Sequence, residues 1–179
     1  MATEKLKLGS LMPAFELISV KGKKLNADDF KETKLMLVIF SCNHCPYVQA
    51  YEERIIKITS DFNNELVVIA INSNDEKNYT EDSLDNMKLI AEEKGFNFHY
   101  LRDADQEVAK AFGATHTPEV FLFNEKRELV FHGKIDDNWQ DESRVNSKYL
   151  RDAINELLSG KEISVPETFT IGCTIKWKK

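Results

Sequence analysis

The chain has 179 residues, a length at which one domain buries about 70% of its unfolded surface without a metal or disulfide. Hydrophobic residues make up 42% and charged residues 30% of the chain, which excludes a disordered polyelectrolyte. The 24 basic and 30 acidic residues give a net charge of −6, which argues against a nucleic-acid-binding surface.

The apolar runs and the cysteines indicate a cellular location. No apolar run reaches the roughly 18–20 residues that a membrane span needs, so we expect no membrane contact. Residues 1–5 lack the apolar segment of a secretory signal. The three cysteines are too few for a disulfide scaffold, and in a reducing compartment such cysteines are more often catalytic or metal-binding. We therefore expect a cytoplasmic protein.

The first predicted elements form an N-terminal β-hairpin over residues 15–17 and 22–23. Two continuous apolar runs follow, at residues 35–40 and 66–71, and such runs are typical of parallel strands covered on both faces. The apolar face of an intervening helix consists of Val48, Tyr51, Ile55 and Ile58. This order predicts a βαβ unit.

The later elements are predicted largely from their boundaries. Thr80 is the expected N-cap of a second helix that Gly95 ends, and Asp105 is the expected cap of a short helix that ends at Gly113. The other predicted elements are a strand over 96–100, a hairpin with strands 120–123 and 129–131, and a last helix over 145–158. The fold class is therefore α/β, with a central mixed sheet flanked by helices.

The strongest chemical signal is Cys42-Asn43-His44-Cys45, which follows the strand at 35–40 and opens the next helix. Residues three apart on a first helical turn lie about 5–6 Å apart, within the range that a disulfide tolerates. Backbone N–H groups at a helix N-terminus stabilise a thiolate. We therefore expect a lowered pKa for Cys42, lowered further by a protonated His44. Cys45 suits the resolving role.

Two other interpretations of the cysteine pair stay open. The pair has the spacing of half a zinc site, but zinc takes four ligands and the chain has no second cysteine pair, so no metal is expected. A purely structural disulfide is unusual in a reducing compartment. Thr117-Pro118, ahead of the strand at 120–123, is by itself typical of a proline at a strand entry.

Several segments carry a family resemblance. The strand–CxxC–helix unit, the Thr-Pro before a hairpin and the closing helix resemble the thioredoxin fold. Two N-terminal segments resemble its redoxin branch, the alkyl hydroperoxide reductase/thiol-specific antioxidant family, and two others are similar to a cytosolic, CxxC-bearing subgroup. These segments are, in that order, Pro13-Ala14-Phe15-Glu16-Leu17, Gly22-Lys23…Asp29-Phe30, Phe40-Ser41-Cys42-Asn43-His44-Cys45-Pro46-Tyr47 and Gly172-Cys173-Thr174-Ile175-Lys176-Trp177-Lys178. The resemblance covers about residues 8–178.

The resemblance implies a fold, a domain organisation and roles for four residues. The fold would be a thioredoxin-like three-layer sandwich with an N-terminal β-hairpin extension. Cys42 would be the nucleophile, Cys45 the resolving thiol and Pro118 a cis-proline beside them. The backbone of Thr117 would pair with a bound substrate strand. The expected domain boundaries are one domain over 1–179, with an extension at 1–33, a core at 34–160 and a tail at 161–179.

Three positions depart from the family pattern. Peroxidases of the family carry Thr three residues before the peroxidatic cysteine, where this chain has Ile39, so a hydrogen bond that positions peroxide is missing. Thioredoxins bury an acid at the position of Met36, so His44, Glu52 or water would have to move the proton of the second thiol. Ser41 stands where thioredoxins have Trp.

The remaining cysteine and the acidic pairs are less specific signals. Cys173 is either a small buried side chain in a docked tail or a third redox thiol that reaches the Cys42 pair when the tail folds back. Asp75-Glu76 and Glu81-Asp82 are typical of solvated charge at helix entries.

Together these features predict an enzyme that exchanges thiols and disulfides on protein substrates, without a bound cofactor. A thioredoxin or glutathione system would regenerate its reduced state. One alternative is a thiol peroxidase, in which Cys42 becomes a sulfenic acid that condenses with Cys45 or Cys173. Another is a redox-sensing or metal-binding adaptor without turnover.

Overall fold

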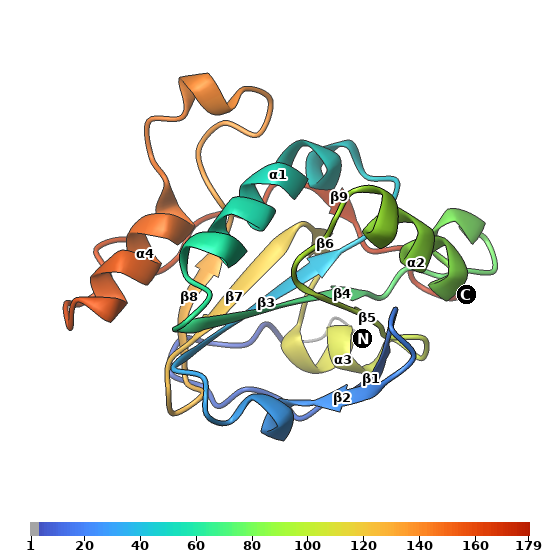
Figure 1. The fold of residues 1–179 in the computed structure, drawn as a ribbon, viewed down its shortest axis with the longest axis horizontal. Coiled ribbons are helices and arrows are strands. Elements are labelled where there is room, and N and C mark those ends of the chain that lie inside the picture. The colour runs from blue at the N-terminus through green and yellow to red at the C-terminus, as the bar shows by residue number, and fades with distance from the viewer. Residues whose placement is uncertain (1–3) are drawn as a thin grey trace.

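The computed structural model describes residues 4–179, so part of the segment at residues 1–5, where we expect no secretory signal, lies outside the described residues. Within residues 4–179, a seven-stranded mixed sheet has the strand order β2-β1-β5-β4-β3-β7-β8 (Figure 1). Its strands are β1 (Glu16–Ser19), β2 (Lys24–Asn26), β3 (Leu35–Ser41), β4 (Leu66–Asn72), β5 (His99–Arg102), β7 (Glu119–Phe123) and β8 (Leu129–Gly133). This confirms the predicted α/β class with a central mixed sheet.

The centre of the sheet is the predicted βαβ unit. β3 and β4 pair in parallel from Leu35↔Leu66 to Ser41↔Asn72, and α1 (Pro46–Asp61) connects them. β7 pairs antiparallel with the other side of β3 and forms a hairpin with β8. β1 and β2 form the predicted N-terminal hairpin, which joins the sheet through an antiparallel pairing of β1 with β5.

Helices cover both faces of the sheet, which makes three layers (Figure 1). Alternate residues of β3 point to opposite faces. Leu37 and Ile39 pack against α1 and α4 (Tyr149–Leu158), whereas Val38 and Phe40 pack against α3 (Glu107–Phe112). α2 (Leu84–Glu93) places Met87 against Ala70 of β4 and Tyr100 of β5. Both faces of β3 are thus buried, as its uninterrupted apolar run predicts.

Several predicted element boundaries were wrong. Ser83, not Thr80, caps α2, because its side chain accepts the Asn86 N–H, while Thr80 begins a short 3₁₀ helix. Gln106 holds the N-cap position of α3, but Asp105 Oδ1 accepts the Glu107 N–H, as expected of a capping side chain. Asp103 accepts the next two N–H groups, those of Val108 and Ala109. The strand expected over 96–100 begins only at His99, and α4 begins at Tyr149 rather than at residue 145. The 3₁₀ helices are η1 (Ala27–Phe30), η2 (Thr80–Asp82) and η3 (Glu142–Arg144).

A second, two-stranded sheet lies beside the start of α1. It consists of β6 (His116–Thr117) and β9 (Cys173–Thr174), which pair antiparallel (Figure 1). The pairing brings the C-terminal tail back to the segment just before Pro118. In the described part of the chain, none of the helices has the length and apolar character that crossing a membrane requires.

Candidate active site

The two cysteines of the motif lie where β3 leads into α1. β3 is buried along its whole length and ends at Ser41, so Cys42 follows it directly. Cys45 is the N-cap residue of α1, and Pro46 is its first helical residue, where the missing N–H of proline costs no helical hydrogen bond. The prediction that Cys42 opens the helix was therefore wrong, because Cys45 holds that position.

Both sulfur atoms contact Thr117. The Thr117-Pro118 peptide bond is cis, as the family resemblance implies. The Sγ atom of Cys42 lies 3.4 Å from Thr117 Oγ1, and the Sγ atom of Cys45 lies 3.3 Å from the Thr117 carbonyl oxygen. The loop before β7 thus meets the cysteine-bearing turn, as the sequence predicts for residues 42, 45, 117 and 118.

A buried carboxylate holds the Thr117-Pro118 loop in place. Glu119 Oε2 accepts the backbone N–H of Thr115 at 2.7 Å and that of His116 at 3.0 Å. Its other oxygen, Oε1, lies 2.7 Å from Nε2 of His132 on β8. Burial pushes the pKa of Glu119 up, but these hydrogen bonds outweigh burial and leave the pKa lowered. The sequence carried no local signal for this support.

Each of the two thiols shifts the pKa of the other. The hydrogen bond to Cys45 and then burial raise the pKa of Cys42, and the nearby Asp82 carboxylate raises it further. The hydrogen bond from Cys42 lowers the pKa of Cys45 to about 4 against the effect of burial, with support from Cys173 and the Val48 backbone N–H. The expected lowering of the Cys42 pKa was wrong, because the neighbouring Cys45, burial and the Asp82 carboxylate all favour the protonated thiol.

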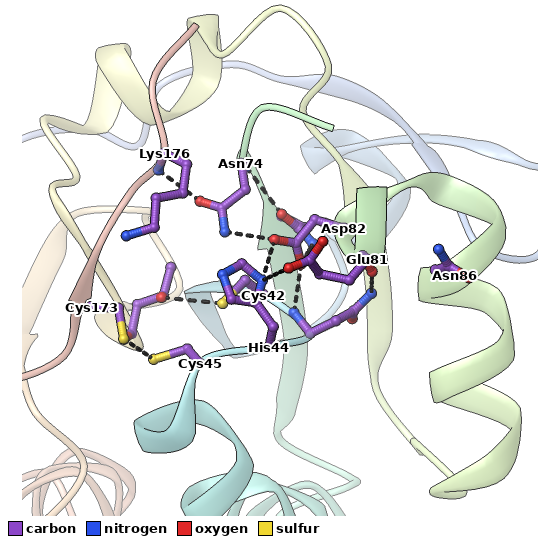
Figure 2. Close-up of polar contacts among 12 residues, drawn as sticks. Cys42, His44, Cys45, Asn74, Glu81, Asp82, Asn86, Cys173 and Lys176 are labelled. Atoms are coloured by element: carbon purple, nitrogen blue, oxygen red, sulfur yellow. Dashed lines mark hydrogen bonds and ion pairs between the residues drawn. The ribbon is translucent and has the colours of Figure 1, made fainter. Parts of the chain in front are cut away.

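The carboxylate beside Cys42 was missed in the sequence. Asp82, the last residue of η2, is fully buried, and its carboxylate lies within 4.8 Å of the Cys42 sulfur. His44 Nδ1 lies 2.7 Å from Asp82 Oδ2 (Figure 2). The prediction that Asp75 and Asp82 are solvated helix-entry charges was wrong, since both are buried.

Three donors hold the Asp82 carboxylate in place. Its Oδ1 accepts the Asn43 backbone N–H at 2.7 Å and the Asn72 side-chain amide at 3.0 Å. Its Oδ2 accepts the Asn74 side-chain amide at 2.8 Å. Such hydrogen bonds offset the cost of burying a charge. The His44 ring stacks on Tyr79. We call Asp82 and His44 together the acidic cluster.

The other predicted proton carrier points elsewhere. Glu52 forms an ion pair with Lys94 at the end of α2, and burial raises the pKa of its carboxyl. Met36 and Ile39, which replace family acid and threonine positions, are fully buried in the hydrophobic core. β3 therefore has Met36 at the position of the family acid, and the buried acid near the thiols is Asp82 of η2 instead.

The C-terminal tail brings Cys173 to the pair. β9 places Cys173 opposite Thr117, and the Sγ atoms of Cys173 and Cys45 lie 2.8 Å apart (Figure 2). All three cysteines are free thiols. Burial and then the hydrogen bond to Cys45 raise the pKa of Cys173 to about 11. Cys173 therefore lies in a docked tail and also contacts the cysteine pair, so both interpretations of Cys173 stay open.

The site also offers possible metal ligands. Among residues 4–179, the thiol of Cys42, the imidazole of His44 and the carboxylate of Asp82 converge within 4.8 Å of one another. Zinc accepts all three ligand types, but a closed structural zinc site uses four ligands. The three residues therefore supply at most the protein ligands of an open site.

The fold and the site define a class of protein. A βαβ-centred mixed sheet with helices on both faces, and a cysteine-bearing turn opposite a cis-proline, are the features of a thioredoxin-like α/β protein. The Redoxin family profile matches residues 7–149. The chain therefore belongs to the Redoxin family.

Several solved structures have the same fold. A hypothetical protein from Sinorhizobium meliloti 1021 is 36% identical, with a TM-score of 0.92 over 98% of this chain and 97% of that one. An uncharacterized conserved protein from Geobacillus kaustophilus is also 36% identical, with a TM-score of 0.92 over 98% and 94%. The thioredoxin domain of a thiol-disulfide oxidoreductase from Bacteroides vulgatus is 20% identical and shares the fold, with a TM-score of 0.62 over 72% and 89%. No curated protein sequence matches this chain significantly.

Proposed function

We propose that this chain is a thiol–disulfide oxidoreductase in which Cys42 and Cys45 alternate between dithiol and disulfide. The observation that carries the proposal is the pair of thiols just before α1, with the Cys42 Sγ atom 3.4 Å from the Thr117 hydroxyl and the Cys45 Sγ atom 3.3 Å from the Thr117 carbonyl oxygen. Exchange requires a thiolate on the attacking sulfur, and transfer of the Cys42 proton to the neighbouring Cys45 would supply it. Membership of the Redoxin family supports an oxidoreductase role, and we assign the chain to a CxxC-bearing branch.

The proposed exchange has two balanced steps. The Cys42 sulfur attacks one sulfur of a substrate disulfide while its proton passes to the Cys45 thiolate. The substrate thiolate that leaves then takes up this proton. Next, the Cys45 thiolate attacks Cys42 Sγ, releases the other substrate sulfur as a thiolate and closes the Cys42–Cys45 disulfide. Two electrons pass to the substrate, and the reverse sequence oxidises a substrate dithiol.

The acidic cluster affects which of the two cysteines carries the negative charge of the reduced pair. Asp82 disfavours a free Cys42 thiolate, so it keeps the charge of the reduced pair on Cys45 until substrate arrives. His44, between the carboxylate and the thiol, compensates the charge of Asp82 when it is protonated. We assign both residues a positioning role in the proton transfer.

We also propose a class of substrates and a cellular location for this exchange. Disulfide or dithiol proteins are the proposed substrates, because the backbone of Thr117 lies beside both thiols and already pairs with one extended segment, β9. A thioredoxin or glutathione system in the cytoplasm would return the pair to its reduced state, and the exchange itself calls for no bound cofactor.

A thiol peroxidase is the second candidate. The hydroxyl of Thr117, 3.4 Å from Cys42 Sγ, favours it, because this hydroxyl can take the place of the threonine that Ile39 replaces. Peroxide would then oxidise Cys42 to a sulfenic acid, which Cys45 would convert to a disulfide with loss of water. A metal-binding adaptor is a third possibility and rests on the convergence of Cys42, His44 and Asp82.

Trapping and turnover test these candidates together. With a disulfide-linked peptide, Cys45→Ser should accumulate a mixed disulfide on Cys42, and Cys42→Ser should lose turnover. The double variant Cys42→Ser/Cys45→Ser is the control for adducts on Cys173. Adducts confined to Cys42→Ser would reverse the two roles. Peroxide turnover far above the free-thiol rate would favour the peroxidase, and stoichiometric zinc without turnover would favour the adaptor.

A further inference from the structure

The C-terminal tail occupies the position that a substrate strand would take. Cys173 pairs with Thr117, and Thr174 pairs with His116, in antiparallel register. A protein substrate paired with Thr117 would use this same backbone edge. In Figure 1 the red C-terminal segment that contains β9 runs alongside β6. The chain therefore covers its own proposed substrate edge with residues 171–178, which we call the C-terminal strap.

The strap is held by a dedicated set of contacts. Gly172 packs so closely on Thr117 that a Cβ atom there would overlap the Thr117 carbonyl oxygen. Ile175 is buried in the main hydrophobic core, and its N–H donates to the Thr115 carbonyl at 2.9 Å. These contacts fix the strap on both sides of Cys173.

Buried polar side chains hold the end of the strap. Asn74 Oδ1 accepts the Lys176 backbone N–H at 2.9 Å (Figure 2). Gln106 Nε2 donates to the Lys176 carbonyl at 2.9 Å, and Gln106 Oε1 accepts the Lys178 N–H at 2.9 Å. Asn74 and Gln106 are each only 2% exposed. Two buried amides whose groups meet the strap backbone indicate a docking groove built for this segment.

The strap delivers a sulfur atom to the centre of the site. Cys173 Sγ lies 2.8 Å from Cys45 Sγ, and Cys42 and Cys45 lie in one buried cluster against which Cys173 packs. Cys45 is therefore the middle member of three thiols and can form a disulfide on either side. An intramolecular pair held in contact exchanges far more readily than free thiols, because its orientation is already set.

We propose that Cys173 is a third redox thiol and that the C-terminal strap acts as an internal substrate strand. This rests on the proposed function, which supplies the Cys42–Cys45 disulfide. The Cys173 thiolate attacks Cys45 Sγ, the Cys45–Cys173 bond forms, and the Cys42–Cys45 bond breaks. Cys42 leaves as the thiolate and takes up the proton that Cys173 released. No electrons are gained or lost in this rearrangement, which leaves Cys42 free to react again.

Peptide mapping can separate the two disulfides. Trypsin leaves Cys42 and Cys45 in one peptide, residues 35–54, and Cys173 in another, residues 162–176. A Cys42–Cys45 bond therefore lies within one peptide, whereas a Cys45–Cys173 bond joins two. The full chain is equilibrated in glutathione buffers from reducing to oxidising, quenched with acid, alkylated and mapped.

The proposal predicts reversible formation of the joined peptide in the wild-type protein and in Cys42→Ser, and its loss in Cys45→Ser. Gly172→Val should reduce the joined peptide about tenfold or more, because the new side chain overlaps the Thr117 carbonyl. The matched control Ile171→Val, at a half-exposed neighbouring position, should leave it unchanged.

The outcomes distinguish the two proposals. If Cys42–Cys45 forms reversibly while Cys173 is alkylated in every buffer, the strap proposal is wrong and the proposed function stands. If neither disulfide forms reversibly, both proposals are wrong. A joined peptide that contains Cys42 in place of Cys45 would also overturn the role of Cys45 as the middle thiol.

Discussion

Removal of the Asp82 charge should lower the pKa of Cys42. The carboxylate and the sulfur lie within 4.8 Å of one another and are both buried. At that distance and an effective dielectric constant of about 20, two unit charges repel by about 3.5 kcal/mol, or about 2.5 pKa units. His44, whose Nδ1 lies 2.7 Å from the carboxylate, cancels part of this repulsion when it is protonated. We therefore expect Asp82→Asn to lower the Cys42 pKa by about 1–2.5 units.

A single-thiol background makes this shift measurable. In Cys45→Ser/Cys173→Ser, the ultraviolet absorbance of the thiolate reports Cys42 alone, with and without Asp82→Asn. The control is Glu81→Gln, which removes the same charge from the neighbouring, half-exposed acid and should shift the Cys42 pKa little. Circular dichroism checks that each variant folds. An unchanged or raised Cys42 pKa in folded Asp82→Asn would refute the proposed charge repulsion.

Two further predictions concern the scaffold of the site. Phe121→Ala should destabilise the protein by about 3–5 kcal/mol in urea unfolding, since its ring is fully buried and packs edge-on against Phe40 and Phe112; a loss below about 1 kcal/mol would contradict this packing. The lowered pKa of Glu119 means that its contribution to stability is complete above its ordinary pKa of 4.5 and is lost as pH falls through the folded-state pKa. Glu119→Gln should therefore have a lower free energy of unfolding at neutral pH and should lose less of it on acidification than the wild type. Parallel pH profiles of the two proteins would count against the Glu119–His132 interaction.

The fold was largely predictable because its signals are local. The uninterrupted apolar runs of β3 and β4, and the helical face between them, identify the parallel unit at the centre of the sheet. The polar turn between residues 123 and 129 identifies the antiparallel β7–β8 hairpin. Helix starts were less predictable, because both Thr80 and Ser83 are suitable N-cap residues. Thr80 begins the 3₁₀ helix η2, and Ser83 caps α2.

The helix start at the active site did have a usable signal. Pro46 is favoured at the first helical position, which makes the residue before it the N-cap. Applied to this sequence, that preference places Cys45, not Cys42, at the helix N-terminus. The lowered pKa of Cys45 does not follow from this position, because its largest cause is the neighbouring Cys42 thiol.

The rest of the site depends on contacts between distant parts of the chain. Asp82 lies 39 residues from Asn43, whose N–H it accepts, and nothing in the local pattern around it separates a buried acid from a solvated one. Cys173 lies 128 residues from Cys45, and only the β6–β9 register brings the two together. Tertiary packing determines such pairings. The sequence could therefore identify the three cysteines as candidates but could not show that Cys173 lies next to Cys45.

The most direct test of the proposed function is the redox equilibrium of the purified protein in glutathione buffers, with mass mapping of each disulfide. We predict a reversible, two-electron transition in which Cys42 and Cys45 become bonded to each other in Cys173→Ser. A protein in which Cys42 and Cys45 are both alkylated at every glutathione ratio would contradict a thiol–disulfide oxidoreductase built on this pair.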